Sequence, residues 1–455
     1  MSNKEKKPAY KSINTPICDF VEQYRSSFSA RFHMPGHKGK GDGYENDITE
    51  ITGADSLYSA SGIIAESMKN AGEIFGADTF YSAEGSSLSI RAMVYLTCLY
   101  AKSKNKKCRI LAGRNAHKSF LSAIILTNAE VEWIYPQDGE SYLSCGVTAE
   151  RIKEILSSSG KDMPTALYIT SPDYLGNTVD ISSISAVCKN CGVLLLVDNA
   201  HGAYLKFFGR HPIEQGADMC ADSAHKTLPV LTGGAYLHIN RAADKFFKEN
   251  ALGALSLFGS TSPSYLILAS LDRANALISS GYDEKIIKLC KEIDKIKQKL
   301  ISYGYKLIGD EPMKITVCAE SVGYTGYELN EKLLDNRLIA EFFDFNYLTL
   351  MLSPENGSDE LESLLSVLLS VQKKAPNIVG EERYIKPQKA MSAREAAFYP
   401  SVKMRAKDAL GKVLATVSVG CPPAVPILVS GEIVDENAIE LFKRYGIEYI
   451  DVIDK

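Results

Sequence analysis

The chain has 455 residues, of which 45% are apolar, and its formal net charge at pH 7 is −4. A chain of this size can bury one large core and a smaller second one, and its mild negative charge argues against nucleic acid as a partner. No apolar run approaches the roughly 20 residues of a membrane span, and the polar N-terminus lacks a signal-peptide core. We therefore expect a cytoplasmic protein without a membrane segment.

The first three hundred residues predict an arm followed by a large α/β domain. Residues 1–60 form an irregular arm, rich in Gly and Pro around 31–39. Over residues 61–303, helical and strand patterns alternate, which predicts a mostly parallel sheet covered on both faces. Helices are expected over 62–75, 85–102, 149–156, 263–280 and 284–302, and strands near 109–111, 131–135, 166–170, 193–197, 219–221 and 235–239.

After Gly304 the pattern changes to that of an α+β domain, which we assign to residues 304–455. Helices are expected over 327–336 and 359–372, and a polar stretch over 373–390 precedes the last segment. Short strands are expected near 314–318, 338–342, 347–352, 413–419 and 447–452.

Ten cysteines are scattered along the chain, many of them within apolar patterns. This distribution is typical of reduced, buried thiols rather than of a disulfide framework. Cys188 and Cys191 form the one close pair, but a zinc site needs a second pair of ligands, so we expect no metal.

A lysine and an aspartate at the ends of two predicted strands carry the strongest chemical signal. Asp198 ends the apolar strand near 193–197, and Lys226 follows a second strand, over 217–221. Taken singly, an Asp after a strand is often a helix cap, and a Lys before a Thr is usually solvated. Together they lie at the carboxyl edge of the sheet, where open α/β sheets bind ligands. Such a lysine can form a Schiff base with pyridoxal phosphate, and the aspartate can keep the ring nitrogen protonated.

Hydroxyl groups near the same edge suit the phosphate of that cofactor. Gly85, Ser86 and Ser87 open a helix, and exposed N–H groups, two hydroxyls and the helix dipole attract an anion there. The alternative is that they only cap the helix. Ser223 and His225 flank Lys226 and can reach the phosphate or the lysine.

Two further histidines are candidates for the cofactor ring. His117 follows the strand near 109–111, so it can stack on a flat ring or relay a proton, although a surface helix cap is an equal alternative. His201 lies three residues after Asp198 and should lie beside the same ring. Gly233 and Gly234 predict a tight turn that can press backbone against a ligand.

Five motifs in chain order resemble the bacterial Orn/Lys/Arg decarboxylase family. They are Arg-Phe-His-Met-Pro-Gly-His-Lys-Gly at 31–39, Asp-Ile-Thr-Glu at 47–50, Arg-Asn-Ala-His-Lys-Ser at 114–119, Ser-Ala-His-Lys-Thr-Leu-Pro at 223–229 and Thr-Ser-Pro-Ser-Tyr-Leu at 261–266. The resemblance is dense over residues 12–280 and loose beyond. It implies a fold type I pyridoxal phosphate enzyme with an aspartate-aminotransferase-like large domain. Long members of the family carry an N-terminal wing domain, and this chain resembles the short form.

The resemblance also assigns roles to single residues. It makes Lys226 the lysine that binds the cofactor covalently, Asp198 the partner of the ring nitrogen and His117 the ring-stacking residue. It places Ser86, Ser87, Ser223 and His225 at the phosphate. It places Thr261 and Ser262 at a subunit interface, because fold type I sites are built between two subunits, so we expect a homodimer or a higher homo-oligomer.

The chain departs from the family pattern at several positions. Asn199 stands where the family more often has Glu or Ser, and Gly233-Gly234 where it often has Gln and a small residue. Cys421 and Ala424 replace a Tyr and a Gly in a segment that lies near the substrate side of the pocket in the family. These departures concern the substrate more than the cofactor.

We expect decarboxylation of a basic L-amino acid, with arginine slightly favoured over lysine and ornithine. Carbon dioxide loss needs a desolvated carboxylate held out of the ring plane, so the grip on the substrate must come from its other end. Glu432, which follows the altered segment, is the candidate for binding the cationic tail. One alternative is a pyridoxal phosphate aminotransferase or lyase on the same fold, with Arg394 or Arg405 fixing the substrate carboxylate. Another is a non-catalytic protein that uses this fold for binding.

Overall fold

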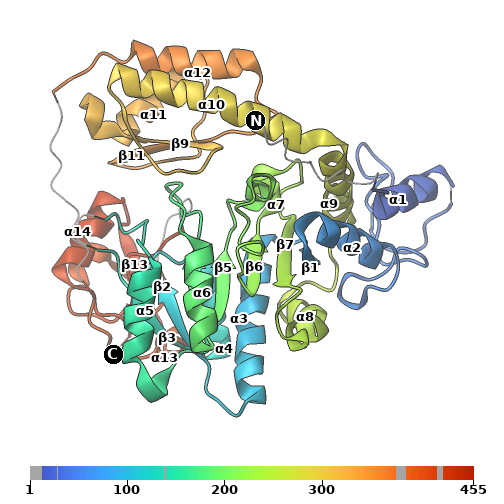
Figure 1. Cartoon of the computed structure of the whole chain (residues 1–455), viewed down its shortest axis with the longest axis horizontal. Coiled ribbons are helices and arrows are strands. Elements are labelled where there is room, and N and C mark those ends of the chain that lie inside the picture. The colour runs from blue at the N-terminus through green and yellow to red at the C-terminus, as the bar shows by residue number, and fades with distance from the viewer. Residues whose placement is uncertain (1–12, 28, 138–139, 376–385, 418–423, 455) are drawn as a thin grey trace, which may run out of the picture.

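The computed structural model describes residues 13–27, 29–137, 140–375, 386–417 and 424–454, and a seven-stranded sheet forms its centre (Figure 1). The strand order is β1-β7-β6-β5-β4-β2-β3. β7 runs antiparallel to both β1 and β6, whereas the other pairings are parallel, which confirms the predicted α/β class. The strands are β1 (Ala77–Ser82), β2 (Arg109–Gly113), β3 (Glu130–Ile134), β4 (Ala166–Thr170), β5 (Leu194–Asp198), β6 (Met219–Asp222) and β7 (Ala235–Asn240).

Helices cover both faces of this sheet because its central strands are apolar on both sides. Ile110, Tyr168 and Leu196 belong to one core, shared with α3, α4 and α8. Leu167 and Leu195, one residue away along the strands, belong to a second core shared with α5 and α6. The helices are α3 (Gly85–Ser103), α4 (Lys118–Thr127), α5 (Ala149–Ser158), α6 (Ile181–Cys191) and α8 (Lys245–Phe258).

β1 was not predicted, and the N-terminal arm is more ordered than predicted. Helix α1 (Pro16–Ser26) begins at a proline, which suits the first turn of a helix. The amides of Ile17 and Cys18 donate to Asp272 Oδ2 at 2.9 and 3.0 Å, so a side chain of α9 holds the start of α1. The neighbouring helices are η1 (Leu57–Ser59), α2 (Ile63–Phe75), α9 (Tyr265–Leu277) and the π-helical turn η4 (Ile278–Tyr282).

A second, antiparallel sheet forms the small domain, in the order β10-β11-β9-β8. Its helices α10, α11 and α12 lie on the side away from the large sheet (Figure 1). The prediction of a strand over 338–342 is wrong except at Phe342, which begins β10. Arg337 has φ 61° and the amide of Leu338 bonds the carbonyl of Leu333, so this stretch closes α11. The elements are β8 (Lys306–Ile308), β9 (Lys314–Cys318), β10 (Phe342–Phe343), β11 (Tyr347–Met351), α10 (Asp283–Tyr303), α11 (Gly326–Asp335) and α12 (Ser358–Ser370).

The C-terminal segment is a third unit with its own two-stranded sheet, so the range 304–455 holds two sheets. Its apolar side chains pack with Tyr142, Leu143 and Leu175 of the large domain. The strand expected over 413–419 is reduced to bridges at Val413 and Leu414, and residues 418 and 419 lie outside the described residues. The elements are α13 (Ala393–Ala397), β12 (Ser401–Arg405), α14 (Glu436–Arg444) and β13 (Tyr449–Ile453).

Short elements complete the chain: η2 (Gly160–Asp162), η3 (Ala203–Phe208), α7 (Ala224–Thr227), η5 (Ala319–Val322) and η6 (Ala406–Asp408). Among the described residues, every helix is too short or too polar to cross a membrane.

Candidate active site

A cavity of about 350 Å³ lies where the parallel strands end, and it collects most of the residues singled out in the sequence. Asp198 is the last residue of β5, and Lys226 lies in the four-residue helix α7, directly after β6. Because β5 and β6 are parallel neighbours, their carboxyl ends meet at this edge. The predicted residues that line the cavity are Gly85, Ser86, Ser87, His117, Asp198, His201, Ser223, His225 and Lys226.

Asp198 is a buried carboxyl with 2% exposure. Burial raises its pKa, and hydrogen bonds from Tyr168 and Ala200 work in the opposite direction. The hydroxyl of Tyr168 donates to Oδ2 at 3.0 Å, and the amide of Ala200 donates to Oδ1 at 3.2 Å. These two donors fix the carboxyl plane at the cavity, where it can accept a further hydrogen bond from a cation.

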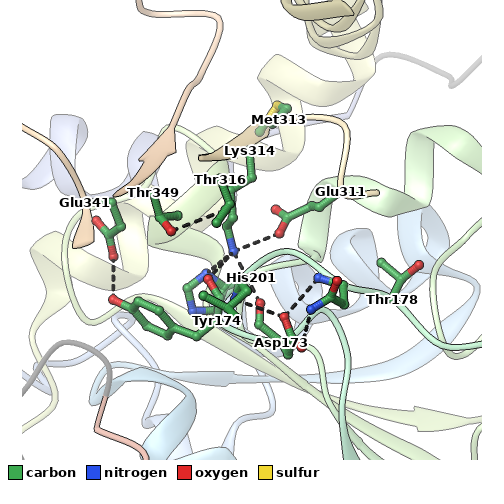
Figure 2. A network of polar contacts seen from close by, with 12 residues as sticks. Asp173, Tyr174, Thr178, His201, Glu311, Met313, Lys314, Thr316, Glu341 and Thr349 are labelled. Atoms are coloured by element: carbon green, nitrogen blue, oxygen red, sulfur yellow. Dashed lines mark hydrogen bonds and ion pairs between the residues drawn. The ribbon is translucent and has the colours of Figure 1, made fainter. Parts of the chain in front are cut away.

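Lys226 contacts His201, whose ring lies between two lysines. Its Nζ is 2.8 Å from His201 Nε2, and Nζ of Lys314 is 3.3 Å from His201 Nδ1. Burial, the largest cause, lowers the pKa of His201 well below its ordinary value, and the charge of Lys314 adds to this effect. His201 is therefore neutral at neutral pH, and Figure 2 shows it at the foot of the Lys314 side chain.

His117 is also held neutral and in one orientation. Burial lowers its pKa to about 4, and the charge of Lys118 adds to this effect. Nδ1 accepts a hydrogen bond from the amide of Ser119 at 3.1 Å, which places the ring proton on Nε2. The residue is thus both the N-cap of α4 and a wall of the cavity, so the two alternatives considered for it are compatible.

Serine hydroxyls line the cavity at the start of α3, a helix of 19 residues. Ser223 Oγ donates to Ser86 Oγ at 2.8 Å, and Ser87 Oγ lies 2.7 Å from Ser119 Oγ. The predicted glycine turn supports this helix start, because the amide of Gly85 donates to the carbonyl of Gly233 at 2.7 Å.

Gly233 itself has φ +100°, and a Cβ there would lie 3.0 Å from a backbone oxygen, so a glycine is favoured.

Several cavity residues were not predicted as site residues. Thr170 ends β4 and Tyr174 follows it, so the strand-end argument that identified Asp198 also applies to them. The Thr170 hydroxyl is buried and has no hydrogen-bond partner among the described residues. Glu341 comes from the small domain, where no motif marks it, and its Oε1 accepts a hydrogen bond from the Tyr174 hydroxyl at 3.0 Å (Figure 2). The unpredicted lining residues are Asn115, Lys118, Thr170, Tyr174, Ala200, Glu341 and Val425.

Glu432 does not line this cavity, which corrects its predicted position. Its Oε2 forms an ion pair with Arg114 at 3.0 Å and accepts the amide of Val429 at 2.7 Å. Both side chains of the pair are buried, so the carboxylate is engaged inside the protein. Thr261 and Ser262 are exposed and also lie outside the lining of the cavity in this single chain.

The segment that departs from the family pattern reaches the cavity at its described end. Ala424 has φ 56°, a left-handed conformation that favours glycine, and this explains why a Gly suits the position. Its carbonyl accepts the amide of Lys118 at 3.0 Å, and the next residue, Val425, lines the cavity. Cys421 lies outside the described residues.

The comparisons with known proteins agree with this geometry. An arginine decarboxylase of Bacillus subtilis is 29% identical over an alignment 470 positions long, which covers 94% of this chain and 93% of the relative. The lysine decarboxylase LdcF of Francisella novicida has the same fold, with a TM-score of 0.76 at 18% identity over 97% of this chain and 81% of that chain. The constitutive lysine decarboxylase of Escherichia coli also has a TM-score of 0.76, at 17% identity over 97% of this chain and 82% of that chain.

The family model for the major domain of Orn/Lys/Arg decarboxylases matches residues 15–316, which include β1 to β7 and every cavity residue of the large domain. The fold is that of fold type I pyridoxal phosphate enzymes, as predicted. The chain therefore belongs to the Orn/Lys/Arg decarboxylase family.

Proposed function

We propose that the protein uses pyridoxal phosphate to decarboxylate a basic L-amino acid, releasing carbon dioxide and the corresponding amine. The observation that carries this proposal is the meeting of Lys226, Asp198 and the serine hydroxyls in one cavity at the carboxyl edge of the sheet. Arginine is slightly favoured over lysine and ornithine. This preference is supported by the arginine decarboxylase of Bacillus subtilis, which aligns with 94% of the chain.

The cavity residues fit pyridoxal phosphate. The N-terminus of α3 with Ser86 and Ser87 suits the phosphate, and Ser223 lies within hydrogen-bond distance of Ser86. The buried hydroxyl of Thr170 has no hydrogen-bond partner among the described residues, and the buried carboxyl of Asp198 can accept a further hydrogen bond in the cavity. When bound, the cofactor supplies a sink for the electrons released as a bond at Cα breaks.

The protein residues have separate tasks in this reaction. Lys226 supplies the amine that binds the cofactor, and Asp198 offers a carboxylate oxygen to a cationic ring nitrogen, a charged hydrogen bond worth about 1.5–3 kcal/mol. His117 supplies a flat neutral ring at the cavity wall. Return of a proton to Cα can be made by His117, His225 or Lys226, which all line the cavity.

Glu341 replaces Glu432 as our candidate for binding the cationic tail of the substrate. Its carboxylate lines the cavity and accepts a hydrogen bond from the Tyr174 hydroxyl, and it can accept further hydrogen bonds from an ammonium or guanidinium group. If the protein binds the substrate through its cationic tail, the α-carboxylate needs no charged partner and can be desolvated, as carbon dioxide loss requires.

Aminotransfer is less well supported by the geometry. An aminotransferase fixes the α-carboxylate, and Arg394 and Arg405 were the candidates for this task. Arg394 donates to the carbonyls of Ile125 and Leu126, and among the described residues neither arginine lines the cavity. A binding protein without turnover would not need the complete set of Lys226, Asp198 and His117.

The decisive experiment is an assay of the purified protein with pyridoxal phosphate against arginine, lysine, ornithine and a neutral and an acidic amino acid. Carbon dioxide and the matching amine should form from at least one basic substrate. Turnover of only a neutral or acidic amino acid would contradict the proposed substrate class, and keto-acid formation would favour an aminotransferase.

We further propose that the active unit is a homodimer or larger, located in the cytoplasm. The exposed Thr261 and Ser262 are then available to complete the partner's cavity. A mixture of Lys226→Ala chains with Thr261→Ala/Ser262→Ala chains should regain part of the activity through hybrid dimers. A fully active monomer by light scattering would refute the assembly.

A further inference from the structure

Lys314 is a buried cation of the small domain that contacts His201, a residue of the active-site cavity. It begins β9, and its side chain and that of Glu311 are each 1% exposed. Its Nζ lies 2.8 Å from Glu311 Oε2, 3.4 Å from the carbonyl of Asp173 and 3.5 Å from that of Tyr174. It also lies 3.3 Å from His201 Nδ1 (Figure 2) and 5.9 Å from the centre of the Tyr174 ring.

These contacts determine where the proton of His201 lies. The carboxylate and the two carbonyls only accept hydrogen bonds, and the adjacent carboxylate stabilises Lys314 as an ammonium ion, which only donates. His201 Nδ1 must therefore accept from Lys314. Since a neutral imidazole carries one proton, that proton lies on Nε2.

The tautomer of His201 has a consequence for Lys226. Nε2 of His201 is 2.8 Å from Nζ of Lys226, so an N–H on Nε2 points at the lysine nitrogen. An ammonium group at Lys226 would place one of its own N–H groups against the N–H of His201. A neutral amine instead accepts the hydrogen bond through its lone pair.

We propose that Lys314 is a positioning residue that, by fixing the tautomer of His201, keeps Lys226 as a neutral amine. The neutral amine is the form of a lysine that attacks a carbonyl carbon. The inference rests on the proposed function and deepens it, because it assigns a task to a residue of the small domain.

Other charged and titratable groups face the same cavity. Asp198 opposes the effect, because its carboxylate attracts an ammonium ion at Lys226. Burial lowers the pKa of His225, as it does that of His117, so both rings are neutral at neutral pH. Lys118 adds a positive charge at the rim and Glu341 a negative one. Lys314 differs from all of these in touching the ring that touches Lys226.

The large domain holds the loop that carries Lys314. Tyr204, in η3, donates its hydroxyl proton to Glu311 Oε1 at 3.3 Å and accepts the amide of Met313 at 3.0 Å. Because these bonds join the two domains, the tautomer of His201 depends on their docking.

Competitive labelling of the full-length, cofactor-free protein tests the proposal. Lysines react as neutral amines with a limiting amount of acetic anhydride, and mass spectrometry of peptides gives the modified fraction of Lys226 at each pH. In Lys314→Met, the labelling profile of Lys226 should move to higher pH by about one unit, so that labelling below the midpoint falls about tenfold. The reason is that loss of the cation lets His201 Nε2 accept from an ammonium ion at Lys226.

Two further variants make the result decisive. Lys314→Met/Glu311→Gln also removes the carboxylate that the single change leaves unpaired, and it should show the same shift if the single variant does not fold. Lys297→Met is the matched control, because Lys297 Nζ contacts the carbonyl of Glu311 at 3.1 Å from the neighbouring α10. It should keep the parental profile.

A parental labelling profile in the Lys314 variants, or an equal shift in Lys297→Met, would overturn the proposal. The labelling needs no turnover, so it can fail while the decarboxylase assay succeeds. A shifted profile in a protein that releases no carbon dioxide would contradict the proposed function alone.

Discussion

Arg114 and His117 lie three positions apart in one loop after β2, yet they belong to two different buried regions. Arg114 donates to the carbonyls of Pro426 and Ile427 and to the carboxylate of Glu432, all in the C-terminal segment. His117 faces the cavity of Lys226. The motif at 114–119 therefore contains one residue with structural contacts, Arg114, and one that lines the candidate active site, His117.

The two regions differ in whether a protein cation engages the carboxylate. Glu432 is paired by Arg114 and by the amide of Val429, which ties the C-terminal segment to the large sheet. The Lys226 cavity instead contains the partnerless hydroxyl of Thr170 and a volume of about 350 Å³. Buried acids are thus ambiguous in sequence, and their contacts in the fold separate a structural ion pair from a residue that lines a cavity.

The largest effect is expected for Lys226→Ala in the cavity. Loss of the nucleophile should lower turnover by about 10⁴-fold or more. Borohydride reduction of the parent with cofactor, followed by peptide mapping, should place a pyridoxyl group on Lys226. A label on another lysine would move the active site away from this cavity.

The other region should respond in stability. Glu432→Gln weakens a buried ion pair, whose loss costs about 3–5 kcal/mol of unfolding free energy, without altering the KM for a basic substrate. Denaturant unfolding checks the first part, with the exposed Glu440→Gln in α14 as the control. A raised KM with unchanged unfolding free energy would indicate that Glu432 binds the substrate. It would contradict the structural role that we assign to this residue.

Glu341→Gln should show the opposite behaviour. Losing a charged hydrogen bond of about 1.5–3 kcal/mol raises the KM for the basic substrate by roughly 10- to 150-fold. The melting temperature should stay close to that of the parent, because Gln can still accept from Tyr174. Steady-state kinetics with a basic and a neutral amino acid would show whether the loss is confined to the cationic tail.

The smallest effect is a pH dependence that arises in the cavity. The pKa of His117 is lowered from 6.5 to about 4 in the folded protein, so the unfolded chain binds more protons between these values. Stability of the cofactor-free protein should therefore fall as the pH drops from 6.5, by up to about 2 kcal/mol at pH 5 from this residue. Unfolding of His117→Gln at both pH values should show a smaller difference than unfolding of the parent.

The sequence determined the α/β class, the central strands and the placement of Lys226 and Asp198 at one edge of the sheet. These follow from local properties: apolar runs that only a buried strand can hold, and polar residues directly at their ends. Periodicity failed at β1, whose edge position beside the antiparallel β7 leaves it only partly apolar, and over 338–342, where the chain closes a helix.

Only the tertiary structure supports our proposal of Glu341 in place of Glu432, and only it connected Lys314 to Lys226 through His201. Both choices depend on contacts between residues far apart in the chain, which no local pattern encodes. Whether a carboxylate can bind a substrate depends on whether the fold already places a protein cation beside it. For Glu432 that cation is Arg114, whereas Glu341 faces an open cavity.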